Sequence, residues 1–165
     1  MPQNPADALS EPLTMEAVAS AFDYLRAVQV GDTRTAGDLL AAEPRMPAFL
    51  TGVAEGIVEA GTSLPGPDDD APIWDSFALE ALGKVFLRAL RRWQQAGPDA
   101  APGIAQTVID FATAIRCEEC GEHYDIAHEL DVYELCAKGR LRLDAQAVDA
   151  RAASAAAYPV DTTAP

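Results

Sequence analysis

Apolar side chains that recur every three or four residues constrain the fold of this chain more than any other feature. Near the N-terminus, for example, Val18, Phe22 and Leu25 fall on one face of a helix. Residues that cap helices, and the prolines and glycines that end them, separate such stretches along the chain. The pattern predicts five helices, at about residues 14–30, 32–42, 47–60, 73–95 and 103–116. Helices joined by short loops are typical of a small helical bundle, so the predicted fold class is mainly α.

Composition supports a helical body with few large core residues. Apolar residues make up 49% of the chain, but many are alanine, which favours helices and buries little area. We expect Trp74 and Trp93, near the ends of one predicted helix, to be buried, with an exposed role at an interface as the alternative, and we expect Gly52 and Gly56 to allow close helix approach. The remaining expected core anchors are Phe22, Phe49, Phe77, Phe86 and Phe111.

The charge of the chain limits its partners. With a formal net charge of -14, it repels nucleic acid phosphates and anionic membrane surfaces, so we expect it to bind neither. The first residues do not resemble a signal peptide, and no apolar run is long enough to cross a membrane. We therefore expect a cytoplasmic protein whose partner is another protein, in particular one with a basic surface.

All three cysteines and both histidines fall within twenty consecutive residues. The candidate metal ligands are Cys117, Cys120, His123, His128 and Cys136. Zinc prefers four thiolate or imidazole ligands, and the C-x-x-C-G spacing at the start of the cluster can place two thiolates on one ion. The segment at 117–139 resembles zinc-ribbon and zinc-knuckle proteins, with Gly139 at the position of a ribbon's fourth cysteine. The resemblance implies a structural zinc ion in a short element near the C-terminus.

The conformation of the following residues decides which ligands could meet. If residues 126–137 form one helix, His128 and Cys136 lie about 12 Å apart along its axis, so one ion could not bind both. The zinc would then use the C-x-x-C pair and one or both histidines, and Cys136 would lie in the core. If residues 131–143 form a hairpin instead, Cys136 could join the C-x-x-C pair. We favour the helix over the first part of this stretch.

The cluster leaves two enzymatic alternatives open. His123, Asp125 and His128 could hold the metal of a hydrolase, and the C-x-x-C pair could act as a redox dithiol. Acidic neighbours disfavour a reactive thiolate, however, and the chain contains no phosphate-binding loop or nucleophile motif. The sequence therefore favours a non-enzymatic protein-interaction or regulatory adaptor module with a structural zinc site.

One predicted helix carries a row of cations, Lys84, Arg88, Arg91 and Arg92, on a single face. An ordinary solvated face is the favoured interpretation, and docking of the acidic segment at 118–134 onto these cations is the alternative.

The sequence predicts one compact domain with small appendages. Its expected parts are a flexible N-terminal arm at 1–12, a helical bundle at 13–116, a zinc-knuckle segment at 117–144, a C-terminal helix at 145–157 and a disordered tail at 158–165.

Overall fold

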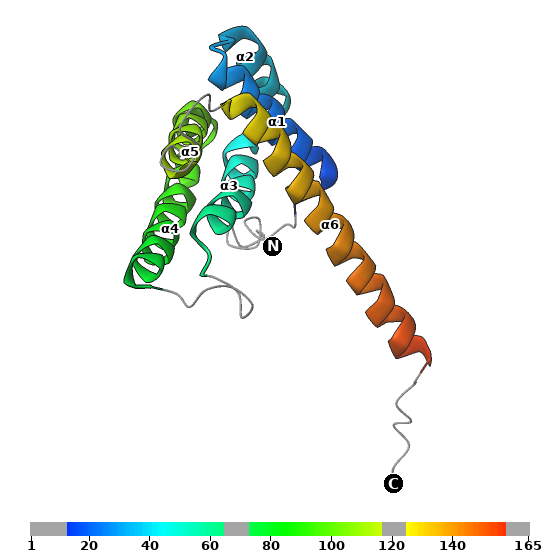
Figure 1. Ribbon diagram of the computed structural model, residues 1–165. Coiled ribbons are helices and arrows are strands. Elements are labelled where there is room, and N and C mark those ends of the chain that lie inside the picture. Colours follow the sequence, from blue (N-terminus) through cyan, green and yellow to red (C-terminus); the bar gives the residue numbers. More distant parts are fainter. Residues whose placement is uncertain (1–12, 65–72, 117–124, 158–165) are drawn as a thin grey trace.

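The computed structural model of the chain describes residues 13–64, 73–116 and 125–157 (Figure 1). These residues form helices and no strand, which confirms the mainly α fold class. The elements are α1 (Met15–Gln29), α2 (Thr33–Ala42), α3 (Met46–Thr62), α4 (Trp74–Trp93), the 3-10 turns η2 (Gln94–Ala96) and η3 (Pro98–Ala100), α5 (Ala101–Arg116) and α6 (Ile126–Ala157). The predicted arm at 1–12 and tail at 158–165 lie outside the described residues.

The first two helices begin and end as predicted. The Thr14 side chain accepts a hydrogen bond from the Ala17 amide at 3.1 Å, which caps α1. Gly31 has a φ of +74°, a conformation that glycine adopts with little strain, and it separates α1 from α2. Asp32 then caps α2 by accepting a hydrogen bond from the Thr35 amide at 3.0 Å.

The core lies around α3, which contacts α1, α4, α5 and α6. Among its largest fully buried side chains are Phe22, Leu25, Leu50, Ile57, Leu90, Ile104 and Leu130. Of the predicted aromatic anchors, Phe22 is fully buried, and Phe86 stacks on Phe111 with ring centroids 4.4 Å apart, which joins α4 to α5. The burial predicted for Trp74, Phe77 and Trp93 is wrong, because all three are exposed.

Helices α3 and α4 approach closely at a glycine other than the two expected. A Cβ atom on Gly83 of α4 would lie 2.5 Å from Thr62 Oγ1 and 2.9 Å from Val58 Cγ1, both on α3. By contrast, a Cβ atom on Gly56 would meet nothing within 4 Å, and one on Gly52 would meet Leu13 rather than a helix. The packing of α3 on α4 therefore depends on the missing side chain at Gly83.

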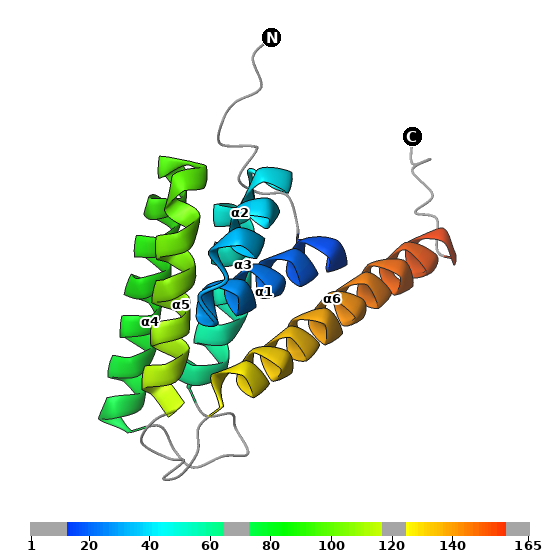
Figure 2. The ribbon, with the colours of Figure 1, turned by 90° about the horizontal axis from the view of Figure 1, so that it is seen from above.

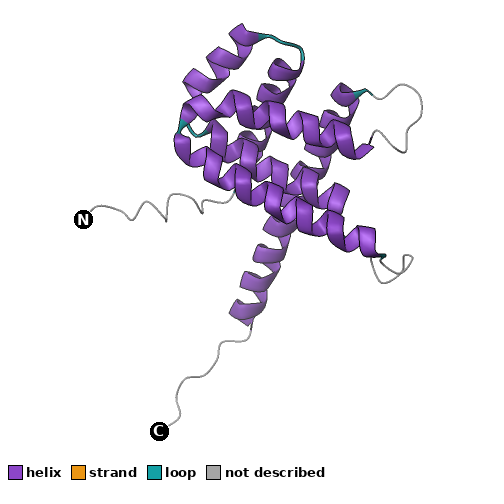
Figure 3. Ribbon diagram, turned by 90° about the vertical axis from the view of Figure 1, so that its left-hand side faces the viewer, coloured by secondary structure: helices purple, strands orange, loops and turns teal. Residues whose placement is uncertain are grey.

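Helix α6 continues without a break through residues 131–143, for which a hairpin was the alternative prediction. Its inward positions follow helical spacing, and these residues are Ile126, Leu130, Tyr133, Ala137 and Leu141. Gly139 does not end the helix, and the helix expected at 145–157 is the C-terminal part of α6. Residues 142–151 are all exposed, and this part of α6 extends beyond the bundle (Figures 2 and 3). Over the described ranges, no helix is long and apolar enough to cross a membrane.

Candidate interaction site

Some of the predicted metal ligands lie in the part of the chain that the structure describes, and the others lie outside it. Cys117, Cys120 and His123 lie outside the described residues. His128 and Cys136 both lie on α6, eight residues apart, so about 12 Å of helix axis separates them. One zinc ion cannot bind both side chains, and the hairpin that would have let Cys136 join the C-x-x-C pair does not form, because residues 131–143 are part of α6.

Cys136 also differs from its expected place in the core. The structure shows it as an exposed free cysteine. The reason lies in its position on α6, because Leu130, Tyr133 and Ala137 face the bundle and Cys136 falls on the outer side. No cluster of three histidine, cysteine or acidic side chains that could hold a metal occurs among the described residues.

Asp125, part of the proposed hydrolase cluster, has a structural role at the start of α6. Its Oδ1 atom accepts a hydrogen bond from the Ala127 amide at 3.0 Å, as expected of a residue that caps a helix N-terminus. His128 is exposed one turn further along.

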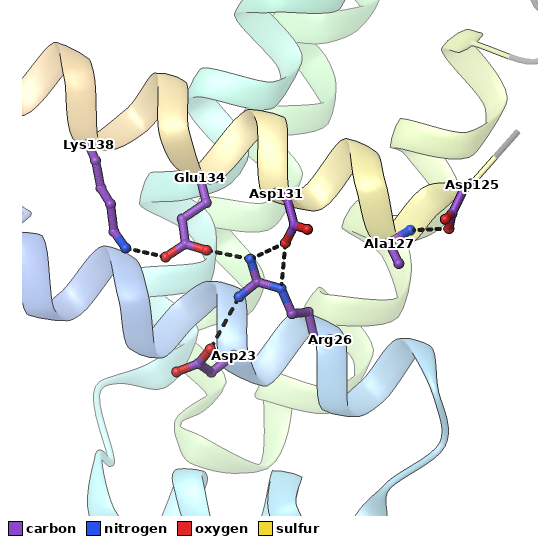
Figure 4. A network of polar contacts seen from close by, with 7 residues as sticks. All are labelled: Asp23, Arg26, Asp125, Ala127, Asp131, Glu134 and Lys138. Carbon is purple, nitrogen blue, oxygen red and sulfur yellow. Dashed lines mark hydrogen bonds and ion pairs between the residues drawn. The ribbon is translucent and has the colours of Figure 1, made fainter.

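An ion-pair network fixes the N-terminal half of α6 on α1 (Figure 4). The Arg26 guanidinium of α1 donates to Asp131 Oδ1 at 2.7 and 3.1 Å and to Asp23 Oδ1 at 3.1 Å. It also donates to Glu134, whose second carboxylate oxygen accepts from Lys138. The acidic side chains at 131 and 134 therefore dock on α1, and not on the cations of α4 as the docking alternative required.

Burial and hydrogen bonding act in opposite directions within this network. Burial alone would raise the pKa of Glu134, but hydrogen bonds donated by Lys138 and Arg26 lower it below its ordinary value. For Arg26, burial lowers the pKa, and the bonds to Glu134 and Asp131 outweigh this and raise it. The network thus keeps both side chains charged and positions α6.

The outer face of α4 is an apolar surface that no other described helix covers. Trp74 is 89% exposed, Leu82 64% and Val85 60%, and Phe77 is also exposed. Alanines at 78, 81 and 89 complete this face, which is opposite the buried side of the helix at Gly83 and Leu90. An apolar helix face of this length on a protein surface is typical of an interaction site.

Two arginines continue the same face toward the C-terminus of α4. Within the described chain, Lys84 pairs with Glu80 at 2.9 Å and Arg91 with Glu55 at 2.7 Å. Arg88 and Arg92 are exposed and have no ion pair with the described residues. The outer face of α4, from Trp74 to Arg92, therefore has an apolar part and a cationic end, and we call it the α4 face.

An apolar cavity of about 270 Å³ lies between α1, α2 and the start of α5. Its lining includes Tyr24, Val28, Ala36, Leu40 and Pro102. The Tyr24 side chain is almost fully buried, and this burial raises the pKa of its hydroxyl. The cavity can hold a small apolar group; Asp32 also lines it, but its carboxylate already accepts a hydrogen bond from the Thr35 amide in capping α2.

From the sequence, Trp74 and Phe77 were expected to be buried, with exposure at an interface as the alternative for Trp74 and Trp93 only, so the α4 face as a whole was not predicted. The available signal was the width of the apolar surface: Phe77, Leu82, Val85 and Leu90 do not fall on one side of a helix. In a small bundle only one side of such a helix can be covered. Comparison with known protein families, curated proteins and solved structures finds no match to this chain.

Proposed function

We propose that this chain is a non-enzymatic protein-interaction module that binds its partner through the α4 face. The exposure of Trp74, Leu82 and Val85 on one side of α4 is the observation that supports this function. Covering three large apolar side chains would favour association at roughly 25 cal/mol for each Å² of apolar surface removed from water. A helix of the partner with its own apolar stripe would match the shape of such a face.

The charges on the chain and on the α4 face indicate which charges the partner should carry. The overall charge of -14 favours a partner with a basic surface, as the sequence predicted. The α4 face itself, however, presents Arg88 and Arg92 without described ion pairs. A partner helix on α4 therefore carries acidic side chains at the end that meets these arginines.

The proposal keeps a structural zinc ion as a second component. The C-x-x-C-G spacing at Cys117 and Cys120 supports it, together with the nearness of both histidines in the sequence. Such an ion would stabilise the connection between α5 and α6, a segment with few apolar residues of its own. His123 or His128 is the third ligand in this proposal.

Site-specific crosslinking tests the interaction function. A photoreactive amino acid replaces Leu82 on α4, and a matched control carries it at Gln106, an exposed position on α5. Both chains are expressed in the cells of the source organism, irradiated and analysed by mass spectrometry. We expect protein adducts at position 82 that the control does not form. Equal labelling of both positions, or no protein adduct at position 82, would refute the interaction function of the α4 face.

A further inference from the structure

We infer that the partner of the α4 face is helix α6 of a second copy of this chain, packed antiparallel to α4. This inference rests on the proposed function of the α4 face. The exposed side of α6 lies on the far side of the bundle from α4, as Figures 1 and 2 both show. The two helices of one chain therefore cannot pair with each other, but those of two copies can.

The exposed stripes of the two helices have the same spacing. On α4 the stripe consists of positions 74, 78, 81, 85, 88 and 92, with steps of four and three residues in alternation. On α6 and the residue before it, read from the C-terminal side, the stripe consists of positions 143, 139, 136, 132, 129 and 125, with the same order of steps; positions 139 and 129 are half-buried and the other four are exposed. Both stripes span about 27 Å at 1.5 Å per residue. This alternation is the one by which antiparallel helices interdigitate their side chains.

The central positions pair small residues with small residues. In this register Ala78 of α4 faces Gly139 of the second copy, and Ala81 faces Cys136. Small side chains allow two helix backbones to approach closely, and of the four positions Ala78, Ala81 and Cys136 are exposed and Gly139 is half-buried. In this register the exposed Cys136 lies against Ala81 of the second copy.

Larger apolar residues flank this centre on both sides. Trp74 of α4 faces Leu143, which is 67% exposed on the projecting part of α6, and Val85 faces Val132. Leu135, 71% exposed, lies at the edge of the same α6 stripe. The contact would thus cover Trp74 and Val85 on α4 and Leu143 and Val132 on α6, all of which the fold leaves exposed.

The charged ends of the stripes are complementary. Arg88 faces Glu129 of the second copy, and Arg92 faces Asp125. Arg88, Arg92 and Glu129 have no ion pair with the described residues of their own chain. A parallel orientation would instead place these arginines next to the part of α6 that contains Leu143. Charge complementarity therefore selects the antiparallel orientation.

The net charge of -14 opposes association of two copies, so the local pairs must outweigh a general repulsion. At about 0.15 M ionic strength the screening length is about 8 Å, which leaves contact ion pairs effective and weakens repulsion between distant charges. Because the α4 face and the α6 stripe are different surfaces, the contact is head-to-tail. An assembly of copies therefore has an unpaired α4 face at one end and an unpaired α6 stripe at the other. Further copies can bind at these ends, which produces a ring or a longer chain of copies.

Charge reversal provides the test. The full-length chain, Arg88→Glu, Glu129→Arg and the double variant with both changes are compared by sedimentation over a range of protein concentrations. We expect the wild-type chain to self-associate, with assemblies larger than a dimer at high concentration. Each single reversal should weaken association by at least about tenfold, because it places like charges in contact. The double variant should restore association, since it exchanges the two partners of one ion pair.

The design separates this contact from a general charge effect. Glu129→Arg reduces the net negative charge by two units, so weaker general repulsion would make it associate more strongly than the wild type. Stronger association of this variant, a monomeric wild type, or no recovery in the double variant would overturn the inference. Circular dichroism of each exposed-site variant confirms that the helices remain folded. A position-82 adduct with a different protein would leave the proposed function standing and overturn only the second copy as partner.

Discussion

Replacing Gly83 by alanine tests how closely α3 and α4 approach. The added Cβ atom would lie 2.5 Å from Thr62 Oγ1 and 2.9 Å from Val58 Cγ1, both closer than real Cβ contacts. The Thr62 hydroxyl donates to the Val58 carbonyl at 2.7 Å, so moving it away sacrifices a buried hydrogen bond. Overpacking of this kind costs about 1–3 kcal/mol.

The intrinsic helix propensity of alanine acts against this cost and must be measured separately. Alanine is favoured over glycine by about 1 kcal/mol in a helix interior, so the net loss of stability for Gly83→Ala is about 0–2 kcal/mol. Gly56→Ala is the matched control, because it gains the same propensity on α3 and its Cβ atom meets nothing within 4 Å. The control should therefore raise the free energy of unfolding.

Urea unfolding followed by circular dichroism gives the free energy of unfolding of both variants and the wild type. Subtracting the free energy of unfolding of Gly83→Ala from that of Gly56→Ala cancels the contribution of helix propensity. The remaining difference is the overpacking cost, which we expect to be about 1–3 kcal/mol. If Gly83→Ala were stabilised as much as Gly56→Ala, the close approach of α3 and α4 would not exist, and the reasoning would be refuted.

Three further predictions concern α6 and the metal. Leu130→Ala should lower the free energy of unfolding by about 2–5 kcal/mol, since Leu130 is fully buried, whereas Leu143→Ala at an exposed position should change it little. Glu134 has a lowered pKa in the folded chain, so its stabilising contribution is present above the ordinary carboxyl pKa and is lost as the pH falls through the folded-state pKa. The stability difference between the wild type and Glu134→Gln in urea should accordingly shrink from pH 7 to acid pH, and a constant difference would contradict the network. Purified wild-type protein should contain one zinc per chain by elemental analysis, and a variant with Cys117→Ser and Cys120→Ser should contain none.

Local signals predicted most of the secondary structure. Thr14 and Asp32 both cap helices where their sequence context indicated, and Gly31 takes the left-handed conformation that separates those helices. These features depend on contacts within three or four residues along the chain. Such contacts are present in the sequence itself, so they could be read from it.

Prediction was weaker wherever a residue's environment depends on another helix. Trp74 was assigned to the core because a large apolar residue on an amphipathic helix is usually buried, yet no described helix covers that side of α4. Cys136 was assigned to the core or to a metal, and the continuous helix places it in solvent. The metal hypothesis itself stays a prediction, because Cys117, Cys120 and His123 lie outside the described residues.

The sequence by itself determined that this protein is helical, where its first helices begin and end, and that its net charge is strongly negative. Those properties follow from backbone propensity, capping and summed charge, which are local or additive. Only the tertiary structure decided which side of each helix is covered. It placed Arg26 of α1 between Asp131 and Glu134 of α6, and it left the outer face of α4 open. Packing depends on shape complementarity between distant segments, such as Gly83 against Thr62, and that information appears only when the helices are brought together.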